Sequence, residues 1–286
     1  MLPNFFIIGA AKAATTSLHA YLGEHPEIHM SPVKEPNFFA LPTRGRPFPT
    51  GRVDRREDYE TLFETGAPLR GESSPSYALY AWRTGVPERI HALVPEARFI
   101  YLVRDPVDRA VAHYLQAVGA GREHRDPDDA LARADSLDHP YACASRYANQ
   151  LEQYLPYFPL ERFLVLDQAD LRTDPHGVLR ETYQFLGADP DFEPAGLGVI
   201  HNAANEKQQR SRALLALRSA PGRSAFDRMP ATVRGPVVTA ARRLLSKPLE
   251  RPEVGEDLRE RLRRLYAPEV ERLRALTGKP FATWTV

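Results

Sequence analysis

Residues 4–22 read Asn-Phe-Phe-Ile-Ile-Gly-Ala-Ala-Lys-Ala-Ala-Thr-Thr-Ser-Leu-His-Ala-Tyr-Leu, and this stretch decides the fold. The run from Asn4 to Gly9 is short and almost continuously apolar, which is typical of a strand buried on both faces of a parallel sheet. The run from Thr15 to Leu22 predicts a helix, with Thr15 or Thr16 as its N-cap. A buried strand followed by small residues and a helix is the beginning of an α/β fold.

Two later segments repeat this pattern of strand and helix. Arg98–Val103 predicts a second strand, and Pro106 opens a helical stretch that runs to about Val118. Arg162–Leu166 predicts a third strand, with an amphipathic helix around residues 147–157 before it and a helix around residues 178–186 after it. The sequence therefore predicts an α/β fold in which helices flank a parallel sheet with right-handed crossovers.

The last part of the chain has a different pattern. Beyond about Ala203 there is no strand-like run, and apolar residues recur at helical spacing: Leu258, Leu262, Leu265, Tyr266, Val270 and Leu273. We therefore expect a single domain over residues 1–286, in which residues 203–286 form a helical extension packed on the sheet. Residues 41–56 and 221–236 are rich in Pro, Gly and Arg, which predicts mobile loops.

Composition excludes several classes of protein. The 286 residues are 43% hydrophobic and 26% charged, an ordinary balance for a chain that buries its own core. The lone Cys143 excludes an intramolecular disulfide and a cysteine-based zinc site. No apolar run approaches the roughly 20 residues that span a bilayer. The N-terminus opens into the first strand without a basic leader, so we expect a cytoplasmic protein.

Charge is unevenly distributed along the chain. The net charge is +1, but residues 207–274 contain 17 basic and 8 acidic residues, a local excess of +9. Such asymmetry can mark a surface that faces an anion, and an arginine-rich helix face exposed to solvent is the alternative.

The small residues between the first strand and the first helix predict an anion site. Backbone N–H groups at a helix N-terminus bind anions, Lys12 adds a positive charge, and the hydroxyls of Thr15, Thr16 and Ser17 add donors. A nucleotide P-loop would read G-x-x-x-x-G-K-[ST], and this loop does not match that pattern. An ordinary turn with an exposed lysine is the alternative.

At these residues the sequence resembles the sulfotransferases that use 3′-phosphoadenosine 5′-phosphosulfate (PAPS), and in particular the heparan sulfate sulfotransferase domains and their bacterial relatives. The 5′-phosphosulfate loop of that family has the form G-x-x-K-x-G-T-T/R-x-L. This chain matches the form at the following residues: Gly9, Lys12, Thr15, Thr16 and Leu18. It departs from the form at Ala14, where the family has glycine.

Further segments carry the resemblance in the same order along the chain. His25–Ile28 and Lys34–Phe39 resemble the H-P-x-I/V and K-E-x-x-F-F segments, and residues 101–114 resemble the 3′-phosphate segment L-R-[ND]-P-x-x-R-A-x-S-x-Y. The serine of that last segment falls on Ala112 here, beside His113. Residues 71–77 and 146–175 resemble the intervening and late segments, so the resemblance covers about residues 4–284.

The resemblance implies a P-loop-like sheet, PAPS as co-substrate without a metal, and sulfuryl transfer to a hydroxyl or amine. The acceptor would be a carbohydrate or another small molecule, and no nucleic-acid partner is implied. Lys12 would stabilise the leaving group and Glu35 would act as general base. The residues implied to bind PAPS are Lys12, Ala13, Ala14, Thr15, Thr16, Ser17, Arg104, Lys207, Arg210 and Arg212.

Several alternatives remain open from the residues themselves. Glu35 could be a surface carboxylate paired with Lys34, Arg104 could pair with Asp105 or Asp108, and the later basic residues could be solvated charges. Phe163–Asp167 resembles the Walker-B strand of a P-loop kinase or NTPase. Ala14 and Ala112 also fit a nucleotide-binding relative without catalysis. The sequence does not indicate the acceptor or the oligomeric state.

Overall fold

The computed structural model describes residues 1–41, 52–197, 209–210, 246–247 and 252–286, and its centre is a five-stranded parallel sheet. The strand order is β2-β3-β1-β4-β5, and every neighbouring pair in this sheet is parallel. The strands are β1 (Phe5–Gly9), β2 (Ile28–Met30), β3 (Leu69–Ser73), β4 (Arg98–Val103) and β5 (Phe163–Asp167). The predicted α/β class with a parallel sheet is confirmed.

The three predicted strands form the centre and one edge of this sheet. All five residues of β1 are buried, and so are Phe99 to Val103 of β4, because helices cover the strands. The sequence did not predict β2 and β3. Strand β2 has only three residues, and the two strands contain His29, Arg70 and Glu72, so they lack the continuous apolar run by which the other strands were found.

The predicted helices are present with small shifts of their ends. The α-helices are α1 (Thr15–Leu22), α2 (Arg56–Thr61), α3 (Val86–Leu93), α4 (Pro106–Gly119), α5 (Pro127–Ala130), α6 (Tyr147–Glu152), α7 (Gln168–Thr173), α8 (Pro175–Leu186) and α12 (Glu256–Thr277). Short 3-10 turns occupy η1 (Pro75–Ala78), η2 (Cys143–Ser145) and η3 (Leu160–Arg162). Helix α6 ends earlier than the predicted helix around residues 147–157, and α2, α3, α5 and α7 were not predicted.

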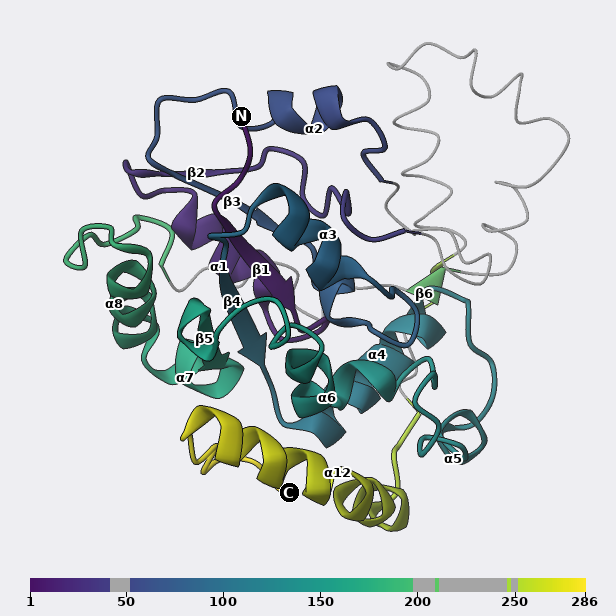
Figure 1. Ribbon diagram of the computed structural model, residues 1–286. Coiled ribbons are helices and arrows are strands. Elements are labelled where there is room, and N and C mark those ends of the chain that lie inside the picture. The colour runs from purple at the N-terminus through teal and green to yellow at the C-terminus, as the bar shows by residue number, and fades with distance from the viewer. Residues whose placement is uncertain (42–51, 198–208, 211–245, 248–251) are drawn as a thin grey trace, which may run out of the picture.

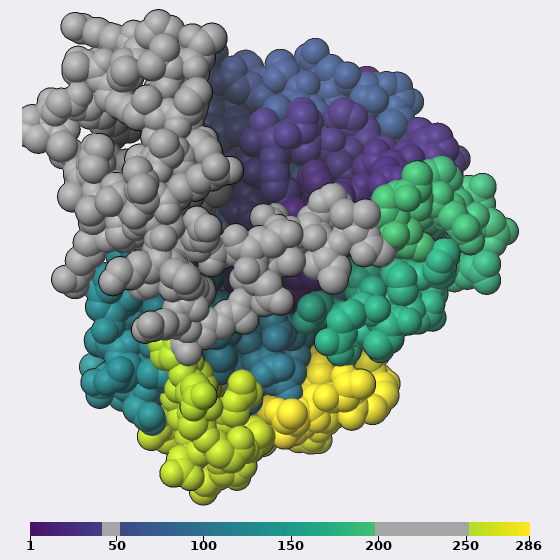
Figure 2. All heavy atoms as spheres, turned by 180° about the vertical axis from the view of Figure 1, so that it is seen from behind, coloured from purple at the N-terminus to yellow at the C-terminus, as the bar shows by residue number. Residues whose placement is uncertain are grey.

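The last helix packs against two helices that flank the sheet. Helix α12 lies along α6 and α4 at the bottom of the view in Figure 1. Seen from behind, its residues again lie at the bottom of the molecule and the first third of the chain lies at the top (Figure 2). Its apolar stripe is buried at Leu258, Leu262, Tyr266, Val270 and Leu273, whereas Leu265 is only partly buried.

The prediction that no strand follows residue 203 is wrong in one detail. Gln209–Arg210 (β6) and Ser246–Lys247 (β7) form a two-residue antiparallel pair, which is too short to give a sequence signal. Most of the predicted mobile loops at 41–56 and 221–236 lies outside the described residues. No helix in the described part of the chain is both long and apolar enough to cross a membrane.

Residues 281–286 hold the carboxyl ends of two neighbouring strands. Asp105 follows β4 and caps α4, and its Oδ2 accepts hydrogen bonds from the backbone N–H of Thr285 at 2.7 Å and from its hydroxyl at 2.8 Å. Asp167 ends β5 and caps α7, and its Oδ2 accepts one from the Trp284 indole at 2.8 Å. Both carboxylate oxygens of Asp167 thus accept hydrogen bonds, which gives this residue a structural role at the end of β5.

Candidate functional site

The loop between β1 and α1 has an unusual backbone that leaves the helix without a side-chain cap. Lys12 and Ala14 are both in the left-handed region, at φ 75° and 65°. Ala14 is the N-cap and α1 begins at Thr15, so the expectation that Thr15 or Thr16 caps this helix is wrong. Glycine adopts this conformation at lower cost, which gives a physical reason for the glycine of the family form at Ala14.

The loop is nevertheless held firmly to the sheet. The N–H of Ala10 donates to the carbonyl of Leu102 on β4 at 2.6 Å, and that of Ala13 donates to the Ala10 carbonyl at 3.1 Å. In the part of the chain that the structure describes, no acceptor faces the N–H groups of Ala14, Thr15 and Thr16. A fixed loop with free amides at a helix N-terminus is suited to binding an anionic group.

The predicted loop side chains are drawn together at this helix start. Ala13, Thr15 and Ser17 are buried, and Lys12, Ala14 and Thr16 are half-buried. Burial and the charges of Arg109 and Lys12 hold the pKa of His113 on α4 well below its usual range. The Lys12 ammonium therefore lies close enough to α4 to act on that helix electrostatically.

Arg109 on α4 connects that helix to the loop between β1 and α1. Its side chain is fully buried and donates to the Ser145 hydroxyl at 2.5 Å, to the Tyr141 carbonyl and, at 3.4 Å, to the Ala11 carbonyl. The guanidinium also faces Nδ1 of His113 at 3.5 Å, which makes that nitrogen an acceptor. Arg109 is therefore a structural residue that joins α4 to the loop and to residues 141 and 145.

Arg104 lies at the carboxyl end of β4, the neighbour of β1, and thus at the same edge of the sheet as the loop. Its guanidinium is 3.6 Å from Asp108, whose other oxygen is 3.0 Å from Arg259 on α12. The alternative ion pair of Arg104 with Asp108 is thus present, whereas Asp105 accepts hydrogen bonds from Thr285 instead. Tyr147 donates to the Arg104 carbonyl at 2.7 Å, so the backbone at this point is fixed.

Lys34 and Glu35 lie near the carboxyl end of β3, the strand on the other side of β1, because Lys34 donates to Ser73 there. Their charged groups are 3.5 Å apart, and the side chain of Glu35 is 35% exposed. Lys34 also donates to the Ser73 hydroxyl at 3.1 Å, and its burial lowers its pKa from the usual value. The ion pair of the alternative interpretation is therefore present, and it leaves about a third of the Glu35 side chain open to a ligand.

Sequence reasoning missed the carboxylate that lies behind this pair. Glu72 on β3 is fully buried, and burial raises its pKa while hydrogen bonds from three hydroxyl groups lower it. Those hydroxyls belong to Tyr59, Ser74 and Tyr77. The stretch Gly-Glu-Ser-Ser-Pro at residues 71–75 is typical of a turn. No local pattern in the sequence shows that hydrogen-bond donors from other segments reach the glutamate.

The remaining predicted site residues lie beyond residue 203. Lys207 and Arg212 lie outside the described residues, and Arg210 is described only as part of β6. Within the described ranges, no group of three or more His, Cys, Asp or Glu could hold a metal ion. Cys143 is buried, and burial raises the pKa of its thiol to about 11, so it is not a reactive nucleophile.

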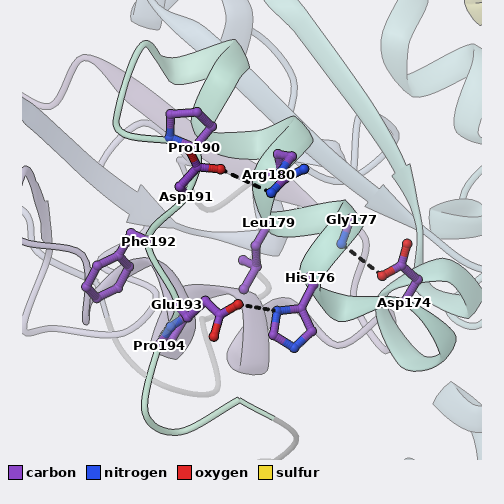
Figure 3. A pocket seen from close by; sticks show the side chains of 10 residues that line it. All are labelled: Asp174, His176, Gly177, Leu179, Arg180, Pro190, Asp191, Phe192, Glu193 and Pro194. Atoms are coloured by element: carbon purple, nitrogen blue, oxygen red, sulfur yellow. Dashed lines mark hydrogen bonds and ion pairs between the residues drawn. The ribbon is translucent and has the colours of Figure 1, made fainter.

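A hollow of about 460 Å³ lies elsewhere, between α8 and residues 190–194, and none of the predicted site residues lines it (Figure 3). His176 and Glu193 pair across it at 3.5 Å, and Arg180 and Asp191 pair at 3.0 Å. These four side chains are thus paired with each other and exposed, and Asp174, which also lines the hollow, caps α8. We locate the candidate site at the loop, Arg104 and Glu35 instead.

Comparisons with known proteins show the family of this chain. Residues 3–194 match the Sulfotransferase family. The human bifunctional heparan sulfate N-deacetylase/N-sulfotransferase 3 is 30% identical over 214 residues, covering 67% of this chain and 23% of that protein. The mouse heparan sulfate glucosamine 3-O-sulfotransferase 6 is 30% identical over 195 residues, covering 65% of this chain and 52% of that protein.

A solved structure is similar over the whole length of the chain. The sulfotransferase from Alicyclobacillus acidocaldarius is 28% identical, with a TM-score of 0.73, and the match covers 100% of both chains. The curated relatives above are longer, so that this chain spans about a quarter and about half of their respective lengths.

Proposed function

The chain belongs to the sulfotransferase family, and we propose that it transfers a sulfuryl group from PAPS to a hydroxyl or amine of an acceptor. The observation that carries this proposal is the fixed loop at residues 10–14 with its lysine, beside Arg104 at one edge of the sheet, followed by amides at residues 14–16 that have no acceptor among the described residues. An α/β sheet binds its ligands at the carboxyl ends of its strands.

The loop binds the 5′ end of PAPS. The N–H groups of Ala14, Thr15 and Thr16 point to the phosphosulfate, and the hydroxyls of Thr15, Thr16 and Ser17 complete the donor set. Lys12 stabilises the negative charge that develops on the phosphate oxygen as the bond to sulfur breaks. Because the loop is anchored to β4 and Arg109, these donors need little rearrangement when the ligand enters.

Arg104 binds the 3′-phosphate. A planar guanidinium suits bidentate contact with a phosphate, and Asp108 holds the Arg104 side chain in place before the ligand arrives. Lys207, Arg210 and Arg212 complete the nucleotide site from the chain beyond residue 203. The serine of the family form is absent at Ala112, so Arg104 carries a larger share of this contact here.

Glu35 accepts the proton of the acceptor. PAPS supplies the sulfuryl group, which passes in line to the acceptor oxygen or nitrogen as its bond to the 5′-phosphate oxygen breaks. Lys34 holds the Glu35 carboxylate at 3.5 Å and keeps it oriented. The protein thus acts by positioning and by charge stabilisation, without covalent chemistry of its own. The family resemblance implies no metal.

The acceptor is a carbohydrate or another small molecule. The names of the two curated relatives identify heparan sulfate and its glucosamine as what those proteins act on. Carrying that class over to this chain is an analogy between sites on one fold. A screen of sugars, phenols and amines with ³⁵S-labelled PAPS identifies the acceptor.

Nucleotide titration tests the proposal against its rivals. Tight binding of PAPS and transfer of label to an acceptor support sulfuryl transfer. Binding of ATP with magnesium but not PAPS would instead indicate a kinase or NTPase. Binding of 3′-phosphoadenosine 5′-phosphate (PAP) with no transfer from PAPS to any acceptor would indicate a relative without catalysis.

Replacing Arg104 by alanine is expected to weaken PAP binding by about 1.5–3 kcal/mol, typical of a hydrogen bond to a charged group. Calorimetry measures this as a rise in Kd of roughly 10- to 150-fold. Ala112→Ser restores the hydroxyl of the family form and should leave the affinity unchanged or tighten it.

Arg261→Ala is the matched control for Arg104→Ala. Arg261 is an arginine of α12 that pairs with Asp128 at 3.2 Å, and both side chains are more than half exposed. This variant should bind PAP as the wild type does. Wild-type PAP affinity in Arg104→Ala would remove Arg104 from the nucleotide site.

A further inference from the structure

The buried carboxylate of Glu72 gathers three hydroxyl groups. Its Oε1 accepts hydrogen bonds from Tyr59 at 2.5 Å and from Tyr77 at 2.8 Å, and its Oε2 accepts one from Ser74 at 2.7 Å. Burial holds the pKa values of both tyrosines well above their usual range, so their hydroxyls keep their protons and can donate. The carboxylate is completely buried, and a charge that is removed from water requires such partners.

Each of these residues also touches the segment that follows Glu35. The Ser74 hydroxyl accepts from the N–H of Asn37 at 3.1 Å, and the Tyr77 hydroxyl accepts from the N–H of Phe39 at 3.2 Å. The Tyr59 ring stacks on Phe38, with ring centres 4.2 Å apart and planes 8° apart. Residues 37, 38 and 39 are thus each held by a side chain that Glu72 orients.

Proton counting shows that the direction of these bonds depends on Glu72. A backbone N–H can only donate, so the hydroxyls of Ser74 and Tyr77 accept on that side. Each hydroxyl has one proton, which must then point to an acceptor on the other side, and Glu72 is that acceptor. Without it, these hydroxyls have no fixed direction.

The segment that is held in this way has a backbone that needs support. Glu35 and Asn37 are in the left-handed region, at φ 61° and 54°. The side-chain amide of Asn37 donates to the Glu35 carbonyl at 2.6 Å, and its oxygen accepts from the Ser76 hydroxyl at 2.5 Å. Non-glycine residues stay in this region only where surrounding contacts determine it.

We propose that Glu72 is a positioning residue for Glu35, acting through the hydroxyls of Ser74 and Tyr77 on the backbone of residues 37–39. The inference rests on the proposed function, because it gives a role to the loop that carries the proposed base. Glu72 itself is fully buried and touches neither the acceptor nor PAPS. Its effect is on the place and direction of the Glu35 carboxylate.

Glu72→Gln is the sharpest test because it keeps the shape of the side chain and changes one acceptor into a donor. Whichever way the new amide turns, at least one hydroxyl loses its acceptor. The amides of Asn37 or Phe39, or both, should then exchange with deuterium roughly 2- to 10-fold faster, as the loss of one hydrogen bond of ordinary strength predicts. Amide exchange resolved by NMR measures this without any activity.

Turnover should respond differently from PAPS binding in the same variant. A shift of the base by about 1 Å can cost up to about 100-fold in rate, so kcat should fall by roughly 10- to 100-fold. The KM and Kd for PAPS should stay as in the wild type, because the loop at residues 10–14 and Arg104 are unchanged. A merely structural role would lower the thermal stability without this separation of kcat from PAPS affinity.

Three partner variants provide matched controls if Glu72→Gln does not fold. Ser74→Ala should speed exchange at Asn37, and Tyr77→Phe should speed exchange at Phe39. Tyr59→Phe removes a hydroxyl from the same carboxylate but none from the backbone, so both amides should exchange as in the wild type. Equal exchange at Asn37 and Phe39 in all of the folded variants would overturn the proposal.

The outcomes separate this proposal from the proposed function. Faster exchange together with lower kcat supports the positioning role. Faster exchange with unchanged kcat overturns it, and if Glu35→Gln also keeps its kcat, the assignment of Glu35 as base fails as well. Unchanged exchange overturns the positioning role whatever the activity shows.

Discussion

Glu35→Gln is expected to bind PAPS as the wild type does and to lose turnover by roughly 10²- to 10⁴-fold, the usual contribution of general acid–base catalysis. Glutamine keeps the shape of the side chain and an oxygen that accepts hydrogen bonds, but it cannot take the proton of the acceptor. The residues proposed to bind the nucleotide, the loop at 10–14 and Arg104, are not altered. Single-turnover transfer of ³⁵S and calorimetry with PAP measure the two quantities separately.

The pH dependence of the same pair of proteins gives a second readout. In the wild type, kcat/KM should fall at low pH, because the essential base of the free enzyme must be unprotonated to accept the proton of the acceptor. This acid limb should vanish from the residual activity of Glu35→Gln. Glu64→Gln is the matched control, because Glu64 is an exposed glutamate just after α2, and it should keep both the rate and the limb.

An unchanged rate together with an unchanged acid limb in Glu35→Gln would place the base elsewhere. His113 is then the next candidate by its position on α4. Burial and the nearby charges of Arg109 and Lys12 hold the pKa of its imidazole well below the usual range, so it is neutral near pH 7 but a weak base. This environment disfavours the proton acceptance that the reaction requires.

Lys12→Ala is expected to lower kcat by roughly 10²- to 10³-fold, the scale on which one preorganised transition-state donor contributes. In the proposed mechanism the ammonium stabilises charge that develops on the leaving phosphate oxygen, so its loss should affect the transition state more than the bound ground state. The Kd for PAP should therefore change less than kcat. End-point assays at saturating PAPS measure kcat, and calorimetry with PAP measures Kd.

The control for Lys12→Ala is Lys279→Ala. Lys279 pairs with Glu181 at 2.9 Å, and its removal should leave turnover unchanged. A folded Lys12→Ala protein with near-normal kcat would exclude Lys12 from the mechanism. Lys12→Arg keeps the charge but changes its reach, and an intermediate rate would show that position matters as well as charge.

The fold was predictable where the sequence has continuous apolar runs. Strands β1, β4 and β5 are buried on both faces, which requires such runs, and helices α1, α4 and α12 begin at or close to the expected residues. Strands β2 and β3 have no such pattern. Glu72 is buried in β3 because Tyr59, Ser74 and Tyr77 reach it, and partners brought by tertiary packing leave no periodic signal.

The site was predictable to a similar extent. The loop, Arg104 and Glu35 were found from residues and resemblance, and their roles stay predictions. The prediction of the N-cap of α1 was wrong because the backbone at Lys12 and Ala14 is left-handed, which makes Ala14 the N-cap. The amino-acid sequence does not show this backbone conformation. The pairing of Asp108 with both Arg104 and Arg259 joins segments more than a hundred residues apart, which no local window contains.

The hydrogen bonds from residues 283–285 to Asp105 and Asp167 have a consequence for folding during protein synthesis. Asp105 is synthesised 180 residues earlier than Thr285, and Asp167 is synthesised 117 residues earlier than Trp284. At the usual pace of translation this interval lasts on the order of ten seconds. During it, both carboxylates can cap their own helices but lack their later partners. The sheet can form on the nascent chain, whereas the carboxyl ends of β4 and β5 are secured only after translation has passed Thr285.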